Sequence, residues 1–151
     1  MKNGVIWQDV DGNDIQAHGG CILYHEGKYY WYGEHKGGEN KLTHLVSGAE
    51  VDRVDVIGIS CYSSTDLCNW KYEGLALAAD KENPNSYLHT SKVVERPKVL
   101  YNEKTEKFVL WMHLDREDYS YAGVGVAVSD TPKAPSPSFA QWFRISRTRA
   151  I

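Results

Sequence analysis

Hydrophobic and polar positions alternate along most of the chain with the two-residue period of β-strands. The clearest case is residues 21–34, where CILYH and YYWYGE flank the turn residues EGK. A similar unit covers residues 98–113, where KVLYN and FVLWMH flank the charged turn EKTEK. Each unit predicts a β-hairpin, which is a pair of antiparallel strands joined by a tight turn.

The two units are copies of one repeat. Tyr24 in the first copy aligns with Tyr101 in the second. A third alternating stretch follows in each copy, GISCYSS and GVGVAVS, and Ser64 at the end of the first aligns with Ser129 at the end of the second. The first copy is longer because residues 37–56, a polar segment with several glycines, interrupt it. We expect this segment to be a long loop.

A repeat of about four strands with almost no helix signal is typical of a β-propeller blade. We therefore predict an all-β fold with about two blades of antiparallel strands. A propeller needs at least four blades to close. Two blades would leave open sheet edges, so we expect either that the chain is part of a longer protein or that it associates with itself through these edges.

The last stretch of the chain breaks the pattern. Residues 134–151 show no clear strand alternation and bring three arginines close together, Arg144, Arg147 and Arg149. We expect the blades to occupy residues 1–133 and the atypical tail to occupy residues 134–151. The tail could come from a truncated or frameshifted reading frame, or it could be an ordinary surface tail.

Composition narrows the class of protein. The chain has 151 residues, a usual length for a single domain, and its formal net charge of -3 argues against a nucleic-acid partner. No apolar stretch is long enough to span a membrane, and the N-terminal residues lack a signal-peptide core. We expect a cytoplasmic protein or one whose leader has been removed.

Three cysteines, an odd number without a CxxC pair, predict neither a disulfide framework nor a zinc site. We expect them to be buried free thiols, although Cys61 and Cys68 could pair. Ten Tyr and five Trp against three Phe give many flat faces with a polar group. Such faces suit sugars, but they also suit the core of a sheet.

Two glutamates stand out among the candidate functional residues. Glu34 follows an aromatic strand, so it could bind a sugar hydroxyl or act as a base. The alternative, which spacing alone favours slightly, is a solvated acid paired with His35 or Lys36. Glu95 lies inside the apolar stretch VVERPKV, and a charge there is costly unless it is paired.

Glu95 could therefore stand at the mouth of a propeller channel, or it could pair with Arg96 or Lys98. Because neighbouring residues on a strand point to opposite faces, pairing with Arg96 is difficult, which favours the functional interpretation.

Other polar residues give weaker signals. His18 precedes two glycines that allow close backbone approach, so it could contact a ligand or satisfy a polar core. His113 and Asp115 share one face of a strand, but two ligands are too few to predict a metal site. Tyr119 and Tyr121 could line a sugar site or simply pack. We predict neither a metal nor a cofactor.

Four motifs, taken together and in order, resemble glycoside hydrolase family 43, in the branch of the exo-β-1,3-galactanases. They are AHGGCILYHEGKYYWYGEHK, CYSSTDLCNWKYEG, VVERPKVLYN and WMHLD, and the resemblance covers roughly the first 130 residues. It implies a five-bladed β-propeller with the sugar bound at the central axis. It also implies an inverting mechanism, in which an acid and a base stand about 6.5–9.5 Å apart.

The resemblance assigns roles to individual residues. It implies that Glu95 is a catalytic residue that tunes the general acid and holds the sugar, and that Glu34 and Tyr119 contact the substrate. Gln16 and His18, in the QAHGG stretch, are added as substrate-binding candidates. This stretch lacks the aspartate base of many family members, and the family's general acid comes from a later blade with no counterpart in this chain.

We therefore expect the N-terminal part of an inverting glycoside hydrolase that acts on β-1,3-linked galactan and is inactive alone. The alternatives are a non-catalytic half propeller that binds galactose-type sugars and a fragment without function. Whether the chain itself is an enzyme stays open. The expected partner is a β-galactan oligosaccharide, with no nucleic acid, no membrane and self-association through open blade edges. Proteins of this family are usually secreted or periplasmic.

Overall fold

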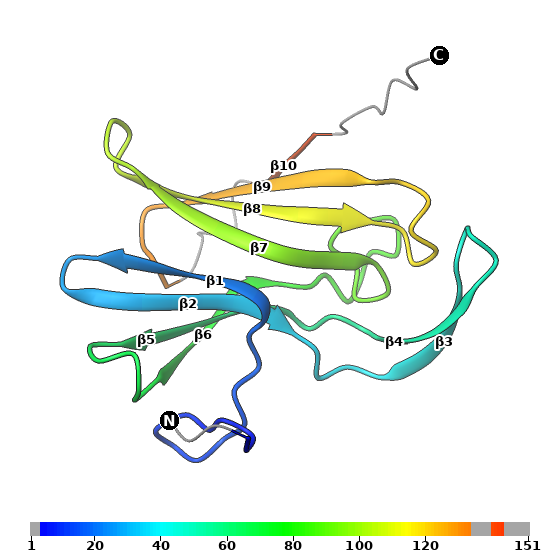
Figure 1. Cartoon of the computed structure of the whole chain (residues 1–151). Coiled ribbons are helices and arrows are strands. Elements are labelled where there is room, and N and C mark those ends of the chain that lie inside the picture. The colour runs from blue at the N-terminus through cyan, green and yellow to red at the C-terminus, as the bar shows by residue number, and fades with distance from the viewer. Residues whose placement is uncertain (1–3, 134–139, 144–151) are drawn as a thin grey trace.

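The computed structural model of the protein describes residues 4–133 and 140–143, and every regular element in these ranges is a β-strand. Figure 1 shows two four-stranded sheets stacked on one another, with a separate hairpin projecting at one end. The prediction of an all-β fold made of about two antiparallel blades is confirmed. The described residues contain no helix that could cross a membrane.

The first blade has the strand order β1-β2-β5-β6 and the second has the order β10-β9-β8-β7, so each is an antiparallel meander. The strands of the first blade are β1 (His18–His25), β2 (Lys28–His35), β5 (Gly58–Ser64) and β6 (Lys71–Ala78). Those of the second are β7 (Val93–Asn102), β8 (Lys107–Asp115), β9 (Gly123–Ser129) and β10 (Ala140–Phe143). Both predicted hairpins and both predicted third strands are present.

The hairpin turns differ in length. Glu26 and Gly27 form the two-residue turn between β1 and β2, with φ angles of 47° and 79°. Positive φ at both positions is the mark of a type I′ turn, whose twist matches that of paired strands. The turn between β7 and β8 is longer, and the Asn102 side chain accepts hydrogen bonds there from the amides of Lys104 and Thr105.

The segment expected to be a loop contains a hairpin instead. β3 (Asn40–His44) pairs with β4 (Glu50–Val54) in a two-stranded sheet of its own. Most side chains of both strands are exposed, and only Thr43 and Arg53 are buried. Without a buried face, the sequence shows no hydrophobic alternation, which is why the strands could not be seen in it.

The core lies between the two blades, where the inward faces of both sheets meet. β1 and β7 lie side by side at one edge of this interface. The buried residues with the least exposure include Tyr32, Ile59 and Cys61 from the first blade and Val93 and Leu114 from the second. A smaller cluster covers the opposite face of the first blade, where Trp70 and Tyr62 pack with the N-terminal segment.

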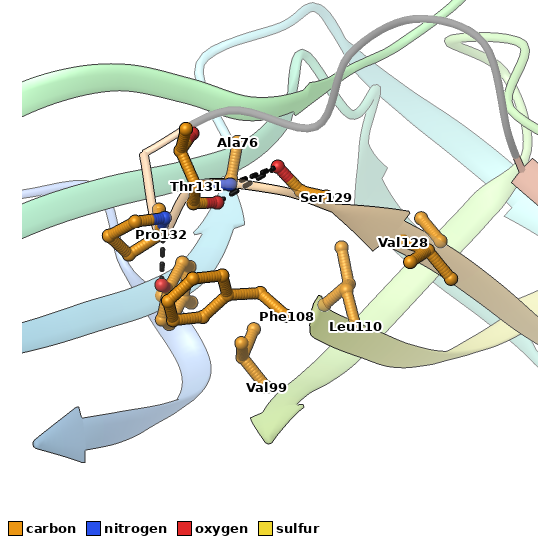
Figure 2. Close-up of a pocket in the computed structure, with 10 residues that line it drawn as sticks. Ala76, Val99, Phe108, Leu110, Val128, Ser129, Thr131 and Pro132 are labelled. Carbon is orange, nitrogen blue, oxygen red and sulfur yellow. Dashed lines mark hydrogen bonds between the residues drawn. The ribbon is translucent and has the colours of Figure 1, made fainter. Parts of the chain in front are cut away.

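The chain returns to the first blade after β9. We call residues 130–133 the strap. The Tyr32 hydroxyl donates to the carbonyl of Pro132 at 2.7 Å, and the Lys133 ammonium lies 2.8 Å from the Glu73 carboxylate. Figure 2 shows the apolar cavity beside the strap, which at about 20 Å³ has room for about one water molecule. The strap therefore ties the second blade to the first.

The tail partly continues the fold. Residues 134–139 and 144–151 lie outside the described residues, whereas β10 pairs with β9 in a region where the sequence indicated no strand. The domain boundary after residue 133 stays a prediction. All three cysteines are free, but only Cys61 is buried, and Cys68 is exposed in the turn after β5, contrary to expectation.

Candidate functional site

Both edge strands at the blade interface carry a β-bulge. The pairing register shifts between His18 and Cys21 in β1 and between Glu95 and Lys98 in β7. Gly19 and Arg96 lie inside these bulges with φ angles of 56° and 54°. A bulge bends its strand and re-aims the side chains next to it. Simple alternation therefore does not describe where the side chains near Glu95 point.

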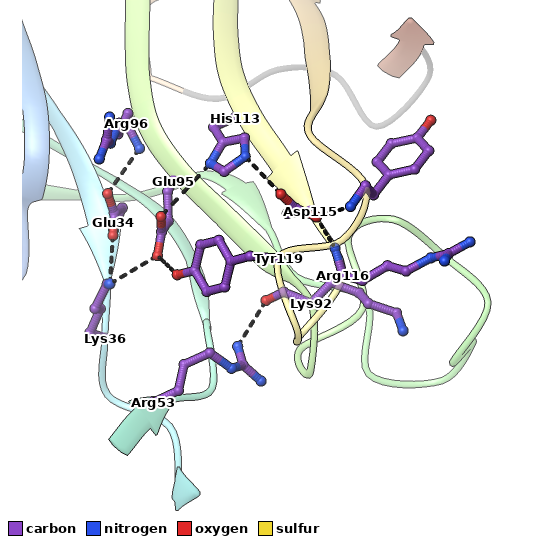
Figure 3. A network of polar contacts seen from close by, with 11 residues as sticks. Glu34, Lys36, Arg53, Lys92, Glu95, Arg96, His113, Asp115, Arg116 and Tyr119 are labelled. Carbon is purple, nitrogen blue, oxygen red and sulfur yellow. Dashed lines mark hydrogen bonds and ion pairs between the residues drawn. The ribbon is translucent and has the colours of Figure 1, made fainter. Parts of the chain in front are cut away.

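Glu34, at the end of β2, occupies the space between the two bulges. Its side chain is only 5% exposed, and its Oε1 accepts a hydrogen bond of 2.9 Å from the backbone amide of Arg96. Its Oε2 lies 2.9 Å from the ammonium of Lys36 (Figure 3). A Cβ on Gly19 would come within 2.5 Å of Oε1. A side chain at residue 19 would therefore displace this carboxylate.

Glu95, near the start of β7, is more open, with a side chain that is 17% exposed. Its Oε1 accepts a 2.8 Å hydrogen bond from the Tyr119 hydroxyl and lies 3.5 Å from the Lys36 ammonium. Its Oε2 lies 3.8 Å from Nδ1 of His113. The contact with His113, helped by Tyr119 and Lys36 and opposed by burial, lowers the pKa of Glu95 to about 2.

The ion pairs that the sequence suggested for Glu95 are not formed. Arg96 offers its backbone amide to Glu34 instead. The Lys98 ammonium lies 3.1 Å from the carbonyl of Gly19 and 3.2 Å from that of Gly20, so it bridges the two bulged strands. The register places Glu95 opposite His113 and Lys98 opposite Trp111, on one face of the sheet, but the Lys98 ammonium reaches across to β1 and not to Glu95.

His113 lies between two carboxylates. Its Nε2 is 3.2 Å from Oδ2 of Asp115, which confirms that the two side chains share one face of β8. The contact with Glu95, and then that with Asp115, raises the pKa of His113 despite its burial. Asp115 also accepts hydrogen bonds from the amides of Arg116 and Tyr121. Asp115 thus anchors both the imidazole and the loop that follows β8.

Tyr119 belongs to that loop, residues 116–122, and has a φ angle of 59°. Burial and the hydrogen bond to Glu95 raise the pKa of its phenol. Tyr119 is therefore a hydrogen-bond donor at neutral pH. Its neighbour Tyr121 stacks on Tyr87, with ring centroids 4.9 Å apart.

The structure brings three of the predicted site residues together, Glu34, Glu95 and Tyr119. With Lys36 and His113 they form a group that we call the carboxylate cluster (Figure 3). His18 stands opposite Glu34 in the pairing of β1 with β2, but its Nε2 contacts Gln16 Oε1 at 3.2 Å, and both lie at the surface of the described part. Their role as binding residues stays a prediction.

The sequence did not reveal the roles of two residues in this cluster. Lys36 was considered only as a surface partner of Glu34, yet it is the cation that joins both glutamates. His113 was considered only as a metal ligand, yet it is the main cause of the low pKa of Glu95. The spacing of Glu34 and Lys36, two residues apart at the end of β2, was the available signal that the two side chains lie on one face. The described residues contain no group of three metal-binding side chains.

The geometry of the cluster limits its chemistry. A general acid needs a proton near neutral pH, and a carboxyl group with a pKa of about 2 has none to give. Glu34 and Glu95 also share the ammonium group of Lys36, so both carboxylates are engaged with one cation. The cluster is suited to hold hydroxyl groups and to stabilise positive charge.

No protein-family model and no curated protein matches the chain. Among solved structures, a GH43 β-1,3-galactosidase with galactodeoxynojirimycin is 45% identical with a TM-score of 0.74, over 95% of this chain and 37% of that chain.

Two exo-β-1,3-galactanases match as well. One, from Phanerochaete chrysosporium with β-1,3-galactotriose, is 37% identical with a TM-score of 0.74, over 94% of this chain and 28% of its own. The other, from Clostridium thermocellum, is 37% identical with a TM-score of 0.69, over 95% of this chain and 27% of its own. The chain thus spans between 27% and 37% of the length of these structures.

Proposed function

We propose that this chain, which belongs to glycoside hydrolase family 43 and resembles its exo-β-1,3-galactanases, forms one wall of the sugar-binding pocket of an inverting hydrolase of β-1,3-linked galactan. The chain supplies two blades of the family's five-bladed propeller. The observation that carries the proposal is the carboxylate cluster, in which two acceptors and two donors converge at the junction of the blades. Sugar hydroxyls require this mixture of acceptors and donors.

Accessibility supports a binding role. The side chains of Glu95, Lys36 and His113 are each partly exposed, at 17%, 33% and 29%, so a ligand can reach them. Glu34 is nearly enclosed and therefore has a fixed position. Related structures were determined with galactose and with β-1,3-galactotriose bound. We propose a galactose-type ligand for this chain on that basis.

Each member of the cluster has a proposed role. Glu95, held ionised by His113 and Lys36, tunes the general acid of the complete propeller and accepts a sugar hydroxyl. Tyr119 donates a hydrogen bond, and Glu34 accepts one while keeping Lys36 in place. His18 and Gln16 contact the sugar at the edge of the pocket.

The chain alone is proposed to bind without cleaving. Among the described residues of the cluster, the carboxyl group with a resolved pKa shift is shifted down, away from the value that a general acid needs. The complete propeller would supply the acid from another blade. Self-association through open blade edges also stays a proposal, for which the exposed Leu100 and Trp111 on the second blade offer an apolar surface.

The test measures binding and turnover separately. We expect galactose to shift the NMR resonances of the cluster in the purified chain, and Tyr119→Phe or Glu34→Gln to weaken binding about tenfold or more, because each variant removes a hydrogen bond to a charged group or a charge. Glu117→Gln is the control, since this exposed acid lies in the same loop. If galactose causes no shift, or shifts all variants alike, the binding pocket is not here.

Hydrolysis of an aryl β-galactoside by the same sample tests the second half of the proposal. We expect no turnover above that of buffer. Turnover that disappears in Glu95→Gln would show that the chain carries its own complete catalytic set, and it would overturn the proposal of an inactive part.

A further inference from the structure

The hairpin of β3 and β4 is inserted in the first blade but is attached to the second. At its tip, the amide of Val46 donates a 2.9 Å hydrogen bond to the carbonyl of Asp118. Just after its base, the Val56 amide donates to the Thr90 carbonyl at 3.1 Å, and the Thr90 hydroxyl donates to the Val56 carbonyl at 2.7 Å. The hairpin therefore contacts the segment before β7 and the loop after β8.

Arg53 on β4 makes the most specific of these attachments. Its side chain is only 9% exposed, and its two terminal nitrogens donate to the carbonyls of Lys92 at 3.2 Å and of Ser91 at 2.6 Å. Asp55, itself buried and also paired with Lys41, balances the charge at 3.1 Å. A planar guanidinium can join two adjacent carbonyls and a carboxylate at once, which an ammonium on a flexible stem does less well.

These attachments flank the bond between Tyr119 and Glu95. Lys92 stands three residues before Glu95, and Asp118 stands immediately before Tyr119. The charge of Arg53 acts on the Tyr119 phenol, whose pKa it lowers against the larger effect of burial. Figure 3 shows Arg53 reaching the Lys92 carbonyl on the side of the cluster where Tyr119 lies. One element thus touches the backbone leading into both partners of this hydrogen bond.

We propose that the β3–β4 hairpin is a brace that holds the Tyr119 hydroxyl on Glu95, and that Arg53 is its positioning residue. The inference rests on the proposed function for its relevance to sugar binding, but its structural content can be tested without any sugar. A residue that only stabilised the fold would lower the free energy of unfolding and leave the Tyr119–Glu95 bond unchanged. A positioning residue changes the environment of the Tyr119 phenol in the folded state.

The first experiment compares Arg53→Lys with the wild type by following the Tyr119 ring carbon in ¹³C-tyrosine-labelled, folded protein. In the wild type, the phenol stays protonated beyond the ordinary pKa of about 10. Lysine keeps the charge but loses the paired carbonyl contacts, so Tyr119 is released from Glu95 and titrates near that ordinary value. Arg116→Gln, which removes an exposed arginine of the same loop, leaves the titration as in the wild type.

The second experiment acts at the tip, in case Arg53→Lys does not fold. Val46→Pro removes the amide that donates to Asp118, whereas Val46→Ala keeps it. We expect the proline variant to bring the Tyr119 pKa toward its ordinary value and the alanine variant to behave as the wild type. The inference is overturned if folded variants at both ends of the hairpin leave the Tyr119 titration unchanged.

Galactose binding then separates this inference from the proposed function. If wild-type chain binds galactose, Arg53→Lys is expected to weaken binding about tenfold, as Tyr119→Phe does, whereas Arg116→Gln is not. If no variant binds galactose but the Tyr119 titration responds to Arg53→Lys, the brace stands and the proposed function fails. If galactose binds equally to Arg53→Lys and the wild type, the brace does not set the sugar site.

Discussion

Three matching positions in the two blades carry polar side chains of opposite type, with an acid in one blade where the other has a base. In the first blade, His18 on β1 stands opposite Glu34 on β2, and Lys36 follows two residues later. At the matching positions of the second blade, Glu95 on β7 stands opposite His113 on β8, and Asp115 follows. In each blade, the second and third residues form a close pair, at 2.9 Å in the first and 3.2 Å in the second.

Both blades have a β-bulge next to these positions, but the two bulges contact Glu34 in different ways. Each bulge contains a residue with φ near 55°, Gly19 in the first blade and Arg96 in the second. Gly19 makes room for the Glu34 carboxylate, whereas Arg96 donates its backbone amide to the same carboxylate oxygen. The comparison shows that two copies of a repeat can share a backbone bulge and still differ in exposure: the Glu34 side chain of the first blade is 5% exposed, and the Glu95 side chain of the second is 17% exposed.

The largest expected effect comes from removing the sealed carboxylate. We expect Glu34→Ala to lower the free energy of unfolding by about 2–4 kcal/mol, because it leaves the Arg96 amide without its acceptor and removes the nearer of the two carboxylates that pair with Lys36. Glu95→Ala should cost less, about 1–3 kcal/mol, since its partners can reach water. Urea denaturation measures both, with the exposed Glu26→Ala as control. Equal losses at the two sites would remove the distinction between the blades.

A smaller effect should separate the two bulges. In Gly19→Ala, the new Cβ contacts the Glu34 carboxylate, and alanine must adopt the left-handed φ of residue 19. Together these two effects should lower the free energy of unfolding by about 2 kcal/mol or more. Arg96→Gly removes the strain of a left-handed φ in the folded state, but it also raises the conformational entropy of the unfolded chain. These two effects oppose each other, so the free energy of unfolding should change by less than about 1 kcal/mol. Denaturation curves of both variants decide. A neutral Gly19→Ala would show that Glu34 can move away.

The smallest effect is a difference in pH dependence. The lowered pKa of Glu95 contributes stability above its ordinary value of about 4.3, and this contribution is lost as the pH falls toward about 2. The raised pKa of His113 contributes stability below about 6.5, and this is lost as the pH rises through the folded-state value. The pair in the second blade should therefore stabilise most between about pH 4.3 and 6.5.

The pair in the first blade should behave differently in the same experiment. Although partial burial opposes it, the Glu34 contact raises the pKa of Lys36 above its ordinary value of about 10.4, so the contribution persists through neutral pH. Unfolding free energies measured from pH 5 to 9 should show a wild-type advantage over His113→Asn that shrinks above about pH 6.5. The advantage over Lys36→Met should stay constant across the same range. Parallel profiles would contradict the assignment of opposite charges.

Much of the fold could be read from local pattern. The alternation around the EGK and EKTEK turns located both hairpins, and the alignment of Tyr24 with Tyr101 located the repeat. These features depend on residues close together in the chain, so they leave a visible period. The grouping of Glu34, Glu95 and Tyr119 followed from the family resemblance and not from spacing.

The other features of the fold and the site depend on contacts between residues far apart in the chain, which produce no periodic pattern in the sequence. Lys36 and Glu95 are 59 residues apart, and the amide of Arg96 reaches Glu34 across 62 residues, through a bulge that reverses the expected direction of side chains. The β3–β4 hairpin was missed because most of its side chains are exposed and its buried residues, Thr43 and Arg53, are polar. Arg53 was missed for the related reason that its partners are backbone carbonyls, which any sequence provides.

The strap has a consequence for how the protein is made. Tyr32 in the first blade finds its acceptor only at Pro132, 100 residues later. At a synthesis rate of about 5–20 residues per second, the strap follows the end of β6 by about 3–10 s. During that interval the inner face of the first blade is covered only as far as β7, β8 and β9 have been made and have packed on it. Nascent-chain protection by a chaperone would be most valuable then, and release from the ribosome would be safest only after the strap has closed.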